Sequence, residues 1–196
     1  MRRRNALAAA FVIGVALIAA AGVLGVRAFR ASRAPRAAEV AACPANARKA
    51  NLDLDMKDTN GRVVHLADYS GKVLLLDFWA TWCVPCQVEL PGFVDIAAKY
   101  KDRGAAVVGV VVLDEFKNAK PYAEAHGMTY PILDGVDRED VEKAFGPMMG
   151  LPTSFVISRD GRICAAHLGV PDIEHSTGTL EQSIEHVFTS EIDRLL

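Results

Sequence analysis

Hydrophobic and polar residues follow one another in a pattern that predicts short strands and longer helices in mixed order. Residues 52–56 and 62–66 have extended character on either side of the turn residues 59–61, which predicts a β-hairpin. Residues 73–79 and 105–113 are nearly continuous apolar runs, typical of buried central strands. We expect a helix between these two runs, and such a crossover makes the strands parallel.

The predicted crossover helix starts at a Cys-x-x-Cys sequence and ends at residues 101–104. Its apolar residues recur at helical spacing: Val88, Leu90, Phe93, Val94, Ile96 and Ala97. Pro91 lies inside the helix, and we expect a kink there.

The second half of the chain predicts shorter elements. Residues 114–150 are the least regular, and we expect two helices and one strand in them, near residues 119–125, 138–145 and 130–133. Two strands at 153–158 and 162–167 follow, joined by the turn Arg159-Asp160-Gly161.

A C-terminal helix with an apolar stripe completes the domain. Thr179 has the position of its N-cap, and Gln182 completes a capping box. The sequence therefore predicts one α/β sandwich with a central mixed β-sheet, an N-terminal β-hairpin and a central insertion.

An uncharged run of 21 residues, 6–26, precedes this domain. As a helix it would be about 31 Å long, which is enough to cross a bilayer core. It is either an uncleaved anchor or a secretory signal with a cleavage site near residues 19–21. We expect an anchor, one N-terminal transmembrane helix within residues 1–26, followed by a tether over 27–50 and a folded domain over 51–196.

Charge is distributed unevenly between these parts. Residues 1–38 contain seven arginines and no acid, whereas residues 39–196 contain 15 basic and 24 acidic side chains. An acidic domain argues against nucleic-acid binding, which needs a clustered basic face. A short arginine-rich N-terminus tends to stay in the cytoplasm while a long domain is translocated, so we expect the domain outside the cytoplasm.

The Cys-x-x-Cys sequence carries the candidate chemistry. At the start of a helix, Cys83 would face unpaired backbone N–H groups and the positive end of the helix dipole, which favour the thiolate. Cys83 is therefore the candidate nucleophile. Cys86 lies one helical turn further on and can attack a mixed disulfide on Cys83, which makes it the candidate resolving thiol.

Two further cysteines, Cys43 and Cys164, can either bond to each other or remain free. Their bond would close a loop of roughly 120 residues, for which chain entropy sets an upper figure of nearly 5 kcal/mol. An even number of cysteines in an exported protein permits such a bond.

Two segments carry a resemblance to a known family: GKVLLLDFWATWCVPCQVELP at 71–91 and GLPTSFVI at 150–157. They resemble the thioredoxin superfamily, and within it the TlpA/ResA/CcmG group of membrane-tethered thioredoxins. The resemblance implies a thioredoxin-like three-layer sandwich and a protein-disulfide reductase. It implies no diffusible cofactor and no metal, because the dithiol itself carries the electrons.

The resemblance also implies roles for individual residues. Asp77 has the position of the family's buried acid, and Glu89 matches an acid that could regulate the proton on Cys86. The alternatives are that Asp77 only hydrogen-bonds backbone at a strand end and that Glu89 is solvated on the helix surface. Pro152 matches a cis-proline facing the dithiol, and Leu151 beside it would offer its backbone to a partner strand.

Three side chains next to the cysteines are further candidates for the substrate-binding surface. Trp82 would form a wall beside Cys83. Val84 and Pro85 would tune the redox potential through the thiolate.

Partners and location follow from the same resemblance. It implies a client protein with a disulfide, either apocytochrome c or a copper-site assembly protein, and a membrane dithiol electron donor. The location would be the bacterial inner membrane, with a single span and the domain facing the periplasm or cell exterior.

Other chemistries remain as alternatives. A peroxiredoxin-like peroxidase shares the fold but has threonine three residues before the reactive cysteine, where this chain has Ala80. A zinc site could be drawn from Cys83, Cys86, Cys164 and His167, although the two halves are far apart in sequence. A non-enzymatic binding module would use the Cys83–Cys86 bond only for structure.

Overall fold

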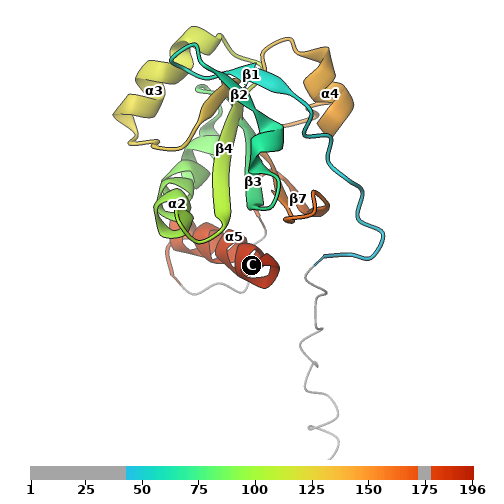
Figure 1. Cartoon of the computed structure of the whole chain (residues 1–196). Helices are drawn as coiled ribbons and strands as arrows, with labels where there is room; N and C mark the ends of the chain where they lie inside the picture. The colour runs from blue at the N-terminus through green and yellow to red at the C-terminus, as the bar shows by residue number, and fades with distance from the viewer. Residues whose placement is uncertain (1–42, 172–177) are drawn as a thin grey trace, which may run out of the picture. The chain divides into compact units, whose positions relative to one another are not determined.

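A five-stranded mixed β-sheet forms the centre of the fold in the computed structural model, which describes residues 43–171 and 178–196 (Figure 1). The strand order is β5-β4-β3-β6-β7. β3 and β4 are parallel, as are β4 and β5, whereas β6 is antiparallel to both β3 and β7. The bounds are β3 (Val73–Trp79), β4 (Ala105–Val111), β5 (Ile132–Asp134), β6 (Thr153–Ile157) and β7 (Ile163–Leu168). The predicted mixed sheet is confirmed.

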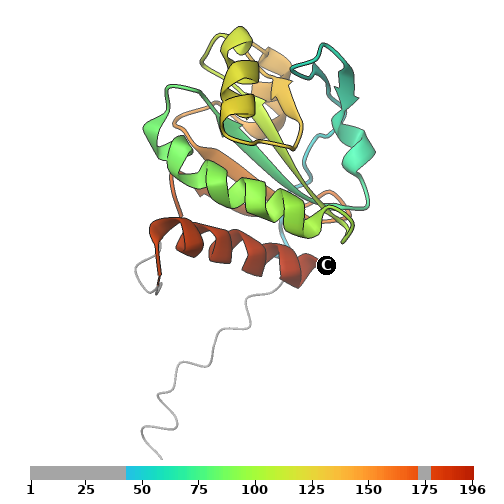
Figure 2. The ribbon, with the colours of Figure 1, turned by 90° about the vertical axis from the view of Figure 1, so that its left-hand side faces the viewer.

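Helices and a small hairpin cover the two faces of this sheet. α2 (Val84–Tyr100) and α5 (Leu180–Leu195) lie side by side along one face, as Figure 2 shows. The remaining elements are the hairpin of β1 (Asp55–Lys57) and β2 (Val63–His65), the 3-10 turns η1 (Leu66–Tyr69) and η2 (Phe116–Asn118), α3 (Ala119–Ala125) and α4 (Glu139–Phe145). The sheet therefore forms the middle layer, with helices on one face and the hairpin and α4 on the other.

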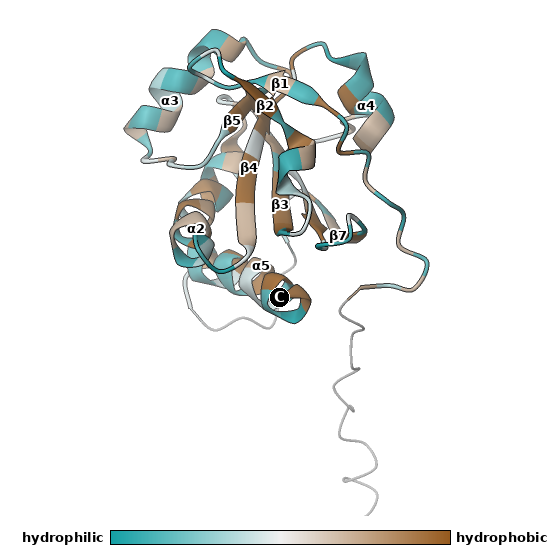
Figure 3. Ribbon diagram, in the orientation of Figure 1, coloured by the Kyte–Doolittle hydropathy of each residue, from teal (hydrophilic) through white to brown (hydrophobic). Residues whose placement is uncertain are grey.

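The alternation of side chains along β3 divides the core into two clusters. All seven residues of β3 are buried. Leu75 and Trp79 pack with residues of α2, α3 and α5, whereas Leu74 and Phe78 pack with the hairpin and α4. Figure 3 shows the hydrophobic colouring of β3 and β4 between these layers. Because successive side chains in a strand point to opposite faces, Asp77 belongs to the α2 side.

The C-terminal helix has the predicted boundary and the predicted apolar face. Thr179 accepts a hydrogen bond from the backbone of Gln182, whose side chain bonds back to Thr179, so the capping box is confirmed. Phe188 of α5 packs edge-to-face on Phe93 of α2, with ring centroids 5.0 Å apart. This contact fixes α5 against α2.

Several boundaries differ from the sequence prediction. α2 contains Pro91 and continues past it as one helix to Tyr100. β4 ends at Val111 rather than at residue 113. β5 covers residues 132–134 rather than 130–133, because Pro131 has no N–H to donate to a neighbouring strand.

Residues 48–50, expected in the tether, are bonded to the folded domain. Arg48 donates to the carbonyl groups of Ala144 and Phe145, and Lys49 forms a bridge with Arg162. The backbone N–H of Ala50 donates to the carbonyl of Gly161 at 2.9 Å. The attachment of the chain to the domain therefore starts before residue 51.

The expected membrane-spanning run, residues 6–26, lies outside the described residues. Among residues 43–171 and 178–196, no helix combines the length and hydrophobicity needed to cross a bilayer.

Candidate active site

A disulfide bond joins Cys83 and Cys86 at the start of α2. Cys83 is the N-cap residue, and its Sγ accepts a hydrogen bond from the backbone N–H of Cys86 at 3.2 Å. Val84 and Pro85 form the first turn, where a proline costs no helical hydrogen bond. The predicted placement of the Cys-x-x-Cys sequence at a helix start is confirmed, and the sulfur of Cys83 accepts from one backbone N–H of the first turn.

The disulfide lies beneath an exposed apolar surface. Cys83 is 2% exposed and Cys86 is 1% exposed, whereas the neighbouring Trp82 and Val84 are 60% and 67% exposed. Large apolar side chains that remain in solvent mark a surface suited to binding another protein. Trp82 and Val84, two of the predicted substrate-binding residues, therefore lie on either side of Cys83 in an exposed position.

Hydrogen bonds from the end of β4 fix the loop before Cys83. Asp114 accepts from the backbone N–H of Thr81 at 2.7 Å and from its hydroxyl at 2.6 Å. The indole Nε1 of Trp82 donates to the carbonyl of Leu113 at 2.8 Å. Sequence reasoning missed Asp114, although its position just after a buried parallel strand places it at the same sheet edge as Thr81.

Asp77 is buried on the α2 side of the sheet, at 1% exposure. Its carboxylate accepts a hydrogen bond from the hydroxyl of Ser154 at 3.1 Å. Burial raises the pKa of Asp77 to about 7, and the Ser154 hydrogen bond opposes this rise only in part. Asp77 can therefore gain or lose a proton near neutral pH.

Glu89 lies within α2, three residues after Cys86, and is fully buried. Neither carboxyl oxygen has a hydrogen-bond partner among the described residues. Burial and, as the smaller cause, the charge of Asp77 together raise the pKa of Glu89 to about 9. The alternative of a solvated surface glutamate is wrong because Glu89 is buried, and its raised pKa keeps it protonated at neutral pH.

Tyr130 is a further buried polar residue in this region, and sequence reasoning missed it. It belongs to the same core cluster as Cys86 and Trp79, and its hydroxyl has no partner in the described part of the chain. Burial raises the pKa of Tyr130, and the charges of Asp77 and Glu89 add to the rise. The residue precedes a proline in an irregular segment, and no local sequence signal links it to the disulfide.

The peptide bond between Leu151 and Pro152 is cis, and it lies immediately before β6. Thr153 pairs with Phe78, so the register places Pro152 opposite the carboxyl end of β3, from which the chain leads to Cys83. Pro152 is buried and Leu151 is partly exposed. The two segments that carry the resemblance thus meet at one end of the sheet.

The second pair of cysteines, Cys43 and Cys164, is also bonded, with Cα atoms 4.6 Å apart. This bond joins the segment before the hairpin to β7. Since Cys164 is paired with Cys43, and His167 instead contacts Glu191 at 3.1 Å, the four residues of the zinc alternative do not converge.

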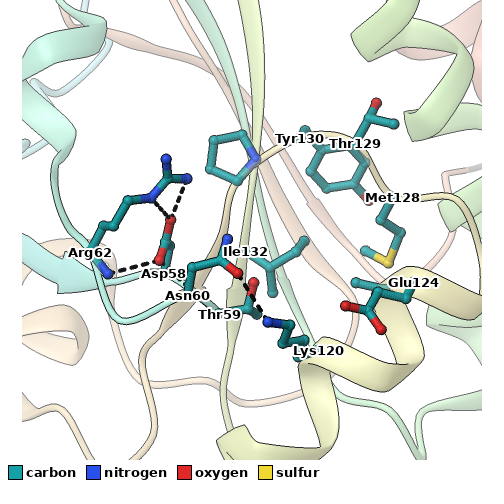
Figure 4. Close-up of a pocket in the computed structure, with 12 residues that line it drawn as sticks. Asp58, Thr59, Asn60, Arg62, Lys120, Glu124, Met128, Thr129, Tyr130 and Ile132 are labelled. Carbon is teal, nitrogen blue, oxygen red and sulfur yellow. Dashed lines mark hydrogen bonds and ion pairs between the residues drawn. The ribbon is translucent and has the colours of Figure 1, made fainter.

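A cavity of about 260 Å³ lies between the hairpin turn and α3 (Figure 4). Arg62 forms an ion pair with Asp58, and Lys120 donates to Asn60 at 3.1 Å. Asp58, Arg62 and Lys120 are thus bonded to other lining residues, and the disulfide is not part of the cavity wall. We therefore do not assign it to the candidate active site.

Solved structures share this fold. A thiol:disulfide interchange protein of the thioredoxin family from Chlorobium tepidum TLS superposes with a TM-score of 0.64 at 26% identity, covering 77% of this chain and 99% of that one. A DsbF homologue from Corynebacterium diphtheriae gives 0.61 at 26% identity, covering 74% and 87%. The fold and the helix-terminal Cys-x-x-Cys define a thioredoxin-like protein.

Sequence comparison gives the family. Residues 47–166 match the AhpC/TSA family, and the chain belongs to it. The thiol-disulfide oxidoreductase ResA of Geobacillus thermodenitrificans is 38% identical over 112 residues, which are 57% of this chain and 63% of that protein. ResA of Bacillus subtilis is 29% identical over 131 residues, or 67% of each chain.

Proposed function

We propose that this protein is a thiol-disulfide oxidoreductase that reduces disulfides in partner proteins. The observation that carries the proposal is the Cys83–Cys86 disulfide at the N-terminus of α2, set among exposed apolar side chains. The names of the ResA relatives and of the interchange protein from Chlorobium tepidum support the same chemistry. The cysteines carry the electrons, so the reaction needs no diffusible cofactor.

The reaction has two exchange steps. The thiolate of Cys83 attacks one sulfur of the partner disulfide, which forms a mixed disulfide and releases the partner's first thiolate. The thiolate of Cys86 then attacks the Sγ of Cys83. This second step breaks the mixed disulfide, releases the partner's second thiolate and leaves the Cys83–Cys86 bond, so that two electrons pass to the partner.

The two buried acids manage the proton of Cys86. In the oxidised protein the raised pKa keeps Glu89 protonated at neutral pH, which is the state expected after it has accepted a proton during exchange. Asp77, with a pKa of about 7, can pass a proton on in either direction. In this role, Asp77 and Glu89 take up the proton of Cys86 during the second exchange step, in which the Cys86 thiolate attacks Cys83.

Leu151 and Pro152 would position the partner. Proline has no N–H, so the backbone of Leu151 is left to pair with an extended segment of the client. Trp82, Val84 and Pro85 would contact the same segment, since all three are exposed beside the disulfide.

We further propose that the protein is anchored by residues 6–26 in the bacterial inner membrane and that its domain faces the periplasm or cell exterior. The uncharged 21-residue run and the arginines on both sides of it support this location. A fusion of the full chain to alkaline phosphatase, which folds actively only outside the cytoplasm, tests the orientation. The intact mass of the membrane-extracted protein separates an anchor from a cleaved signal.

The proposed client is apocytochrome c or a copper-site assembly protein, and a membrane dithiol protein would return the electrons. Both assignments rest on the resemblance to the membrane-tethered thioredoxins.

Trapping of a mixed disulfide tests the exchange reaction. The full-length Cys86→Ser variant, reduced and then mixed with oxidised apocytochrome c, should form a covalent adduct that dithiothreitol dissolves. The control variant Cys83→Ser/Cys86→Ser should form none. If the Cys86→Ser variant forms no adduct with either client class, the exchange proposal fails.

A second candidate function has one observation in its favour. Cys83 is only 2% exposed, as expected of a structural disulfide in a non-enzymatic binding module. The trapping experiment separates the two, because a structural bond gives no adduct. A peroxidase would instead show rapid, saturable, thiol-dependent consumption of hydrogen peroxide.

A further inference from the structure

Positively charged side chains gather at one end of the domain. Four segments make up this end: residues 71–72 before β3, 101–104 after α2, 158–162 between β6 and β7, and 193–196 at the end of α5. We call these segments the basic end, because they contain six cations and only three acids. The cations are Lys72, Lys101, Arg103, Arg159, Arg162 and Arg194, and the acids are Asp102, Asp160 and Asp193.

Contacts between the four segments bring their charges together. The N–H of Gly71 donates to the carbonyl of Arg159 at 3.0 Å. A Cβ atom placed on Gly104 would lie 3.5 Å from both the Nη2 of Arg159 and the Cδ2 of Leu196. Figure 2 shows that α2 and α5 end on the same side of the domain, where the hydroxyl of Tyr100 donates to Asp193 at 2.6 Å. The six cations therefore share one end of the molecule.

Most of these cations lack an acidic partner. Arg162 pairs with Asp160, whereas the other five form no salt bridge within residues 43–171 and 178–196. All five are exposed. Of the 15 basic and 24 acidic side chains in residues 39–196, the rest of the domain keeps 9 and 21. The basic end is therefore opposite in charge to the remainder of the domain.

The chain enters the folded domain at this same end. A groove of about 440 Å³ is lined by Cys43 together with Arg159, Arg162 and Arg194. The bond from Cys43 to Cys164 of β7 holds the entering chain there. Residues 27–42, which follow the uncharged run 6–26, can span at most about 55 Å. The segment that we place in the membrane is thus joined to the basic end of the domain.

We propose that the basic end docks on anionic phospholipid headgroups of the membrane that holds residues 6–26, a proposal that rests on the proposed anchoring. Clustered lysines and arginines next to a membrane anchor are attracted to an anionic lipid surface. The guanidinium groups of Arg159, Arg162 and Arg194 suit the phosphates of the headgroups, because arginine can bind phosphate with two parallel hydrogen bonds. The acidic remainder of the domain is repelled by the same surface, so charge also selects the orientation.

This orientation turns the disulfide away from the lipid. Cys83 caps the N-terminus of α2, whereas residues 101–104 of the basic end follow its C-terminus. α2 has 17 residues, which correspond to about 25 Å of helix. Docking therefore holds the Cys83–Cys86 disulfide and the exposed Trp82 on the aqueous side, where a client protein reaches them. The proposal goes beyond disulfide exchange, because it assigns the opposite end of the domain to the membrane.

Lysine footprinting on the full-length protein tests the docking. The protein is placed in nanodiscs of phosphatidylcholine alone or of an equal mixture of phosphatidylcholine and phosphatidylglycerol, and acetylation is followed by mass spectrometry. Lys72 and Lys101 should react at least threefold more slowly in the anionic discs. Lys57 and Lys143, which are exposed outside the basic end, should react equally in both. Addition of 1 M KCl should remove the difference, because it shortens the screening length to about 3 Å.

Each contrary result has a distinct meaning. Equal acetylation of Lys72 and Lys101 in the two kinds of disc overturns the proposal. Slow acetylation in both kinds of disc that becomes slower with protein concentration also overturns it, because a second copy would then cover the basic end. A protein that stays in neither kind of disc contradicts the proposed anchor, on which the docking rests, so the two failures are distinguishable.

Charge reversal provides matched variants. Arg159→Glu/Arg194→Glu should abolish the difference at Lys72 and Lys101, and it leaves the backbone hydrogen bond from Gly71 to residue 159 in place. Lys117→Glu/Lys120→Glu changes the net charge equally at exposed positions outside the basic end, and it should keep the difference. Slower acetylation that persists in the arginine variant, or that disappears equally in both variants, would contradict docking through the basic end.

Discussion

At the scale of single residues, the burial of Asp77 and Glu89 is the property that separates this site from an ordinary disulfide. Both are buried carboxylic acids, Asp77 on β3 and Glu89 on α2, and each has its pKa raised mainly by burial. A raised pKa in the folded state means that the folded protein holds protons that the unfolded chain releases. The stability of the oxidised protein must therefore depend on pH.

Replacement of Glu89 tests this dependence. In the unfolded chain Glu89 loses its proton near the ordinary pKa of 4.5, whereas in the folded protein it does so only near pH 9. The free energy of unfolding therefore falls as the pH rises between these two values. The slope approaches about 1.4 kcal/mol per pH unit for one full proton. Glu89→Gln removes this contribution. Urea unfolding between pH 5 and pH 9 should show a flatter pH profile for this variant than for the wild type.

A matched control keeps this experiment specific. Glu181 is exposed on the first turn of α5, and Glu181→Gln should keep the slope of the wild type. If Glu89→Gln also kept that slope, Glu89 would not hold a proton that the unfolded chain releases.

The residues around the disulfide differ in how far the sequence could predict them. The position of Asp77 on the α2 side follows from alternation along an apolar strand, so the sequence indicated its burial. Asp114 follows β4 and Tyr130 precedes β5, and they reach the site only through the crossovers that place β4 and β5 beside β3. No local pattern encodes such contacts, and only the assembled sheet shows them.

At the scale of elements, the predictions succeeded where a helix or strand has its own local signals. α5 carries both an apolar stripe and a capping box, and it begins at the predicted residue. β5 carries weaker signals, because it is short and its start depends on Pro131. Residues 105–113 illustrate the same limit, since the apolar run continues past Val111, where pairing with β3 ends.

Removal of the α5 cap gives a test at this scale. Thr179→Ala deletes the side chain that accepts from Gln182, and loss of such a cap typically costs about 1 kcal/mol. Chemical denaturation should show this decrease in the free energy of unfolding, whereas Thr179→Ser, which keeps the hydroxyl, should recover most of it. Equal stability of the alanine and serine variants would mean that the cap does not hold α5.

At the scale of the whole molecule, two disulfides have separate tasks. Cys83–Cys86 closes a short loop within the candidate active site, whereas Cys43–Cys164 spans 121 positions of sequence and attaches the entering chain to β7. The sequence left the second bond open, because pairing of distant cysteines depends on where the fold brings them. A long closed loop restricts the unfolded chain, which stabilises the folded state.

The variant Cys43→Ser/Cys164→Ser should therefore lose about 2 to 5 kcal/mol in the free energy of unfolding, measured under non-reducing conditions. The Cys83–Cys86 pair should keep the redox behaviour of the wild type in this variant. An unchanged unfolding midpoint would show that the long-range bond does not stabilise the domain.

The reduction potential of the Cys83–Cys86 pair tests the central proposal most directly. The full-length Cys43→Ser/Cys164→Ser variant, equilibrated in glutathione or dithiothreitol buffers, allows the fraction of reduced Cys83 to be followed by thiol alkylation and mass spectrometry. A protein-disulfide reductase should give a value near about −270 mV or below, at the thioredoxin end of the range. A value near about −120 mV would make it an oxidant, and a pair that never equilibrates with the buffer would be a structural disulfide.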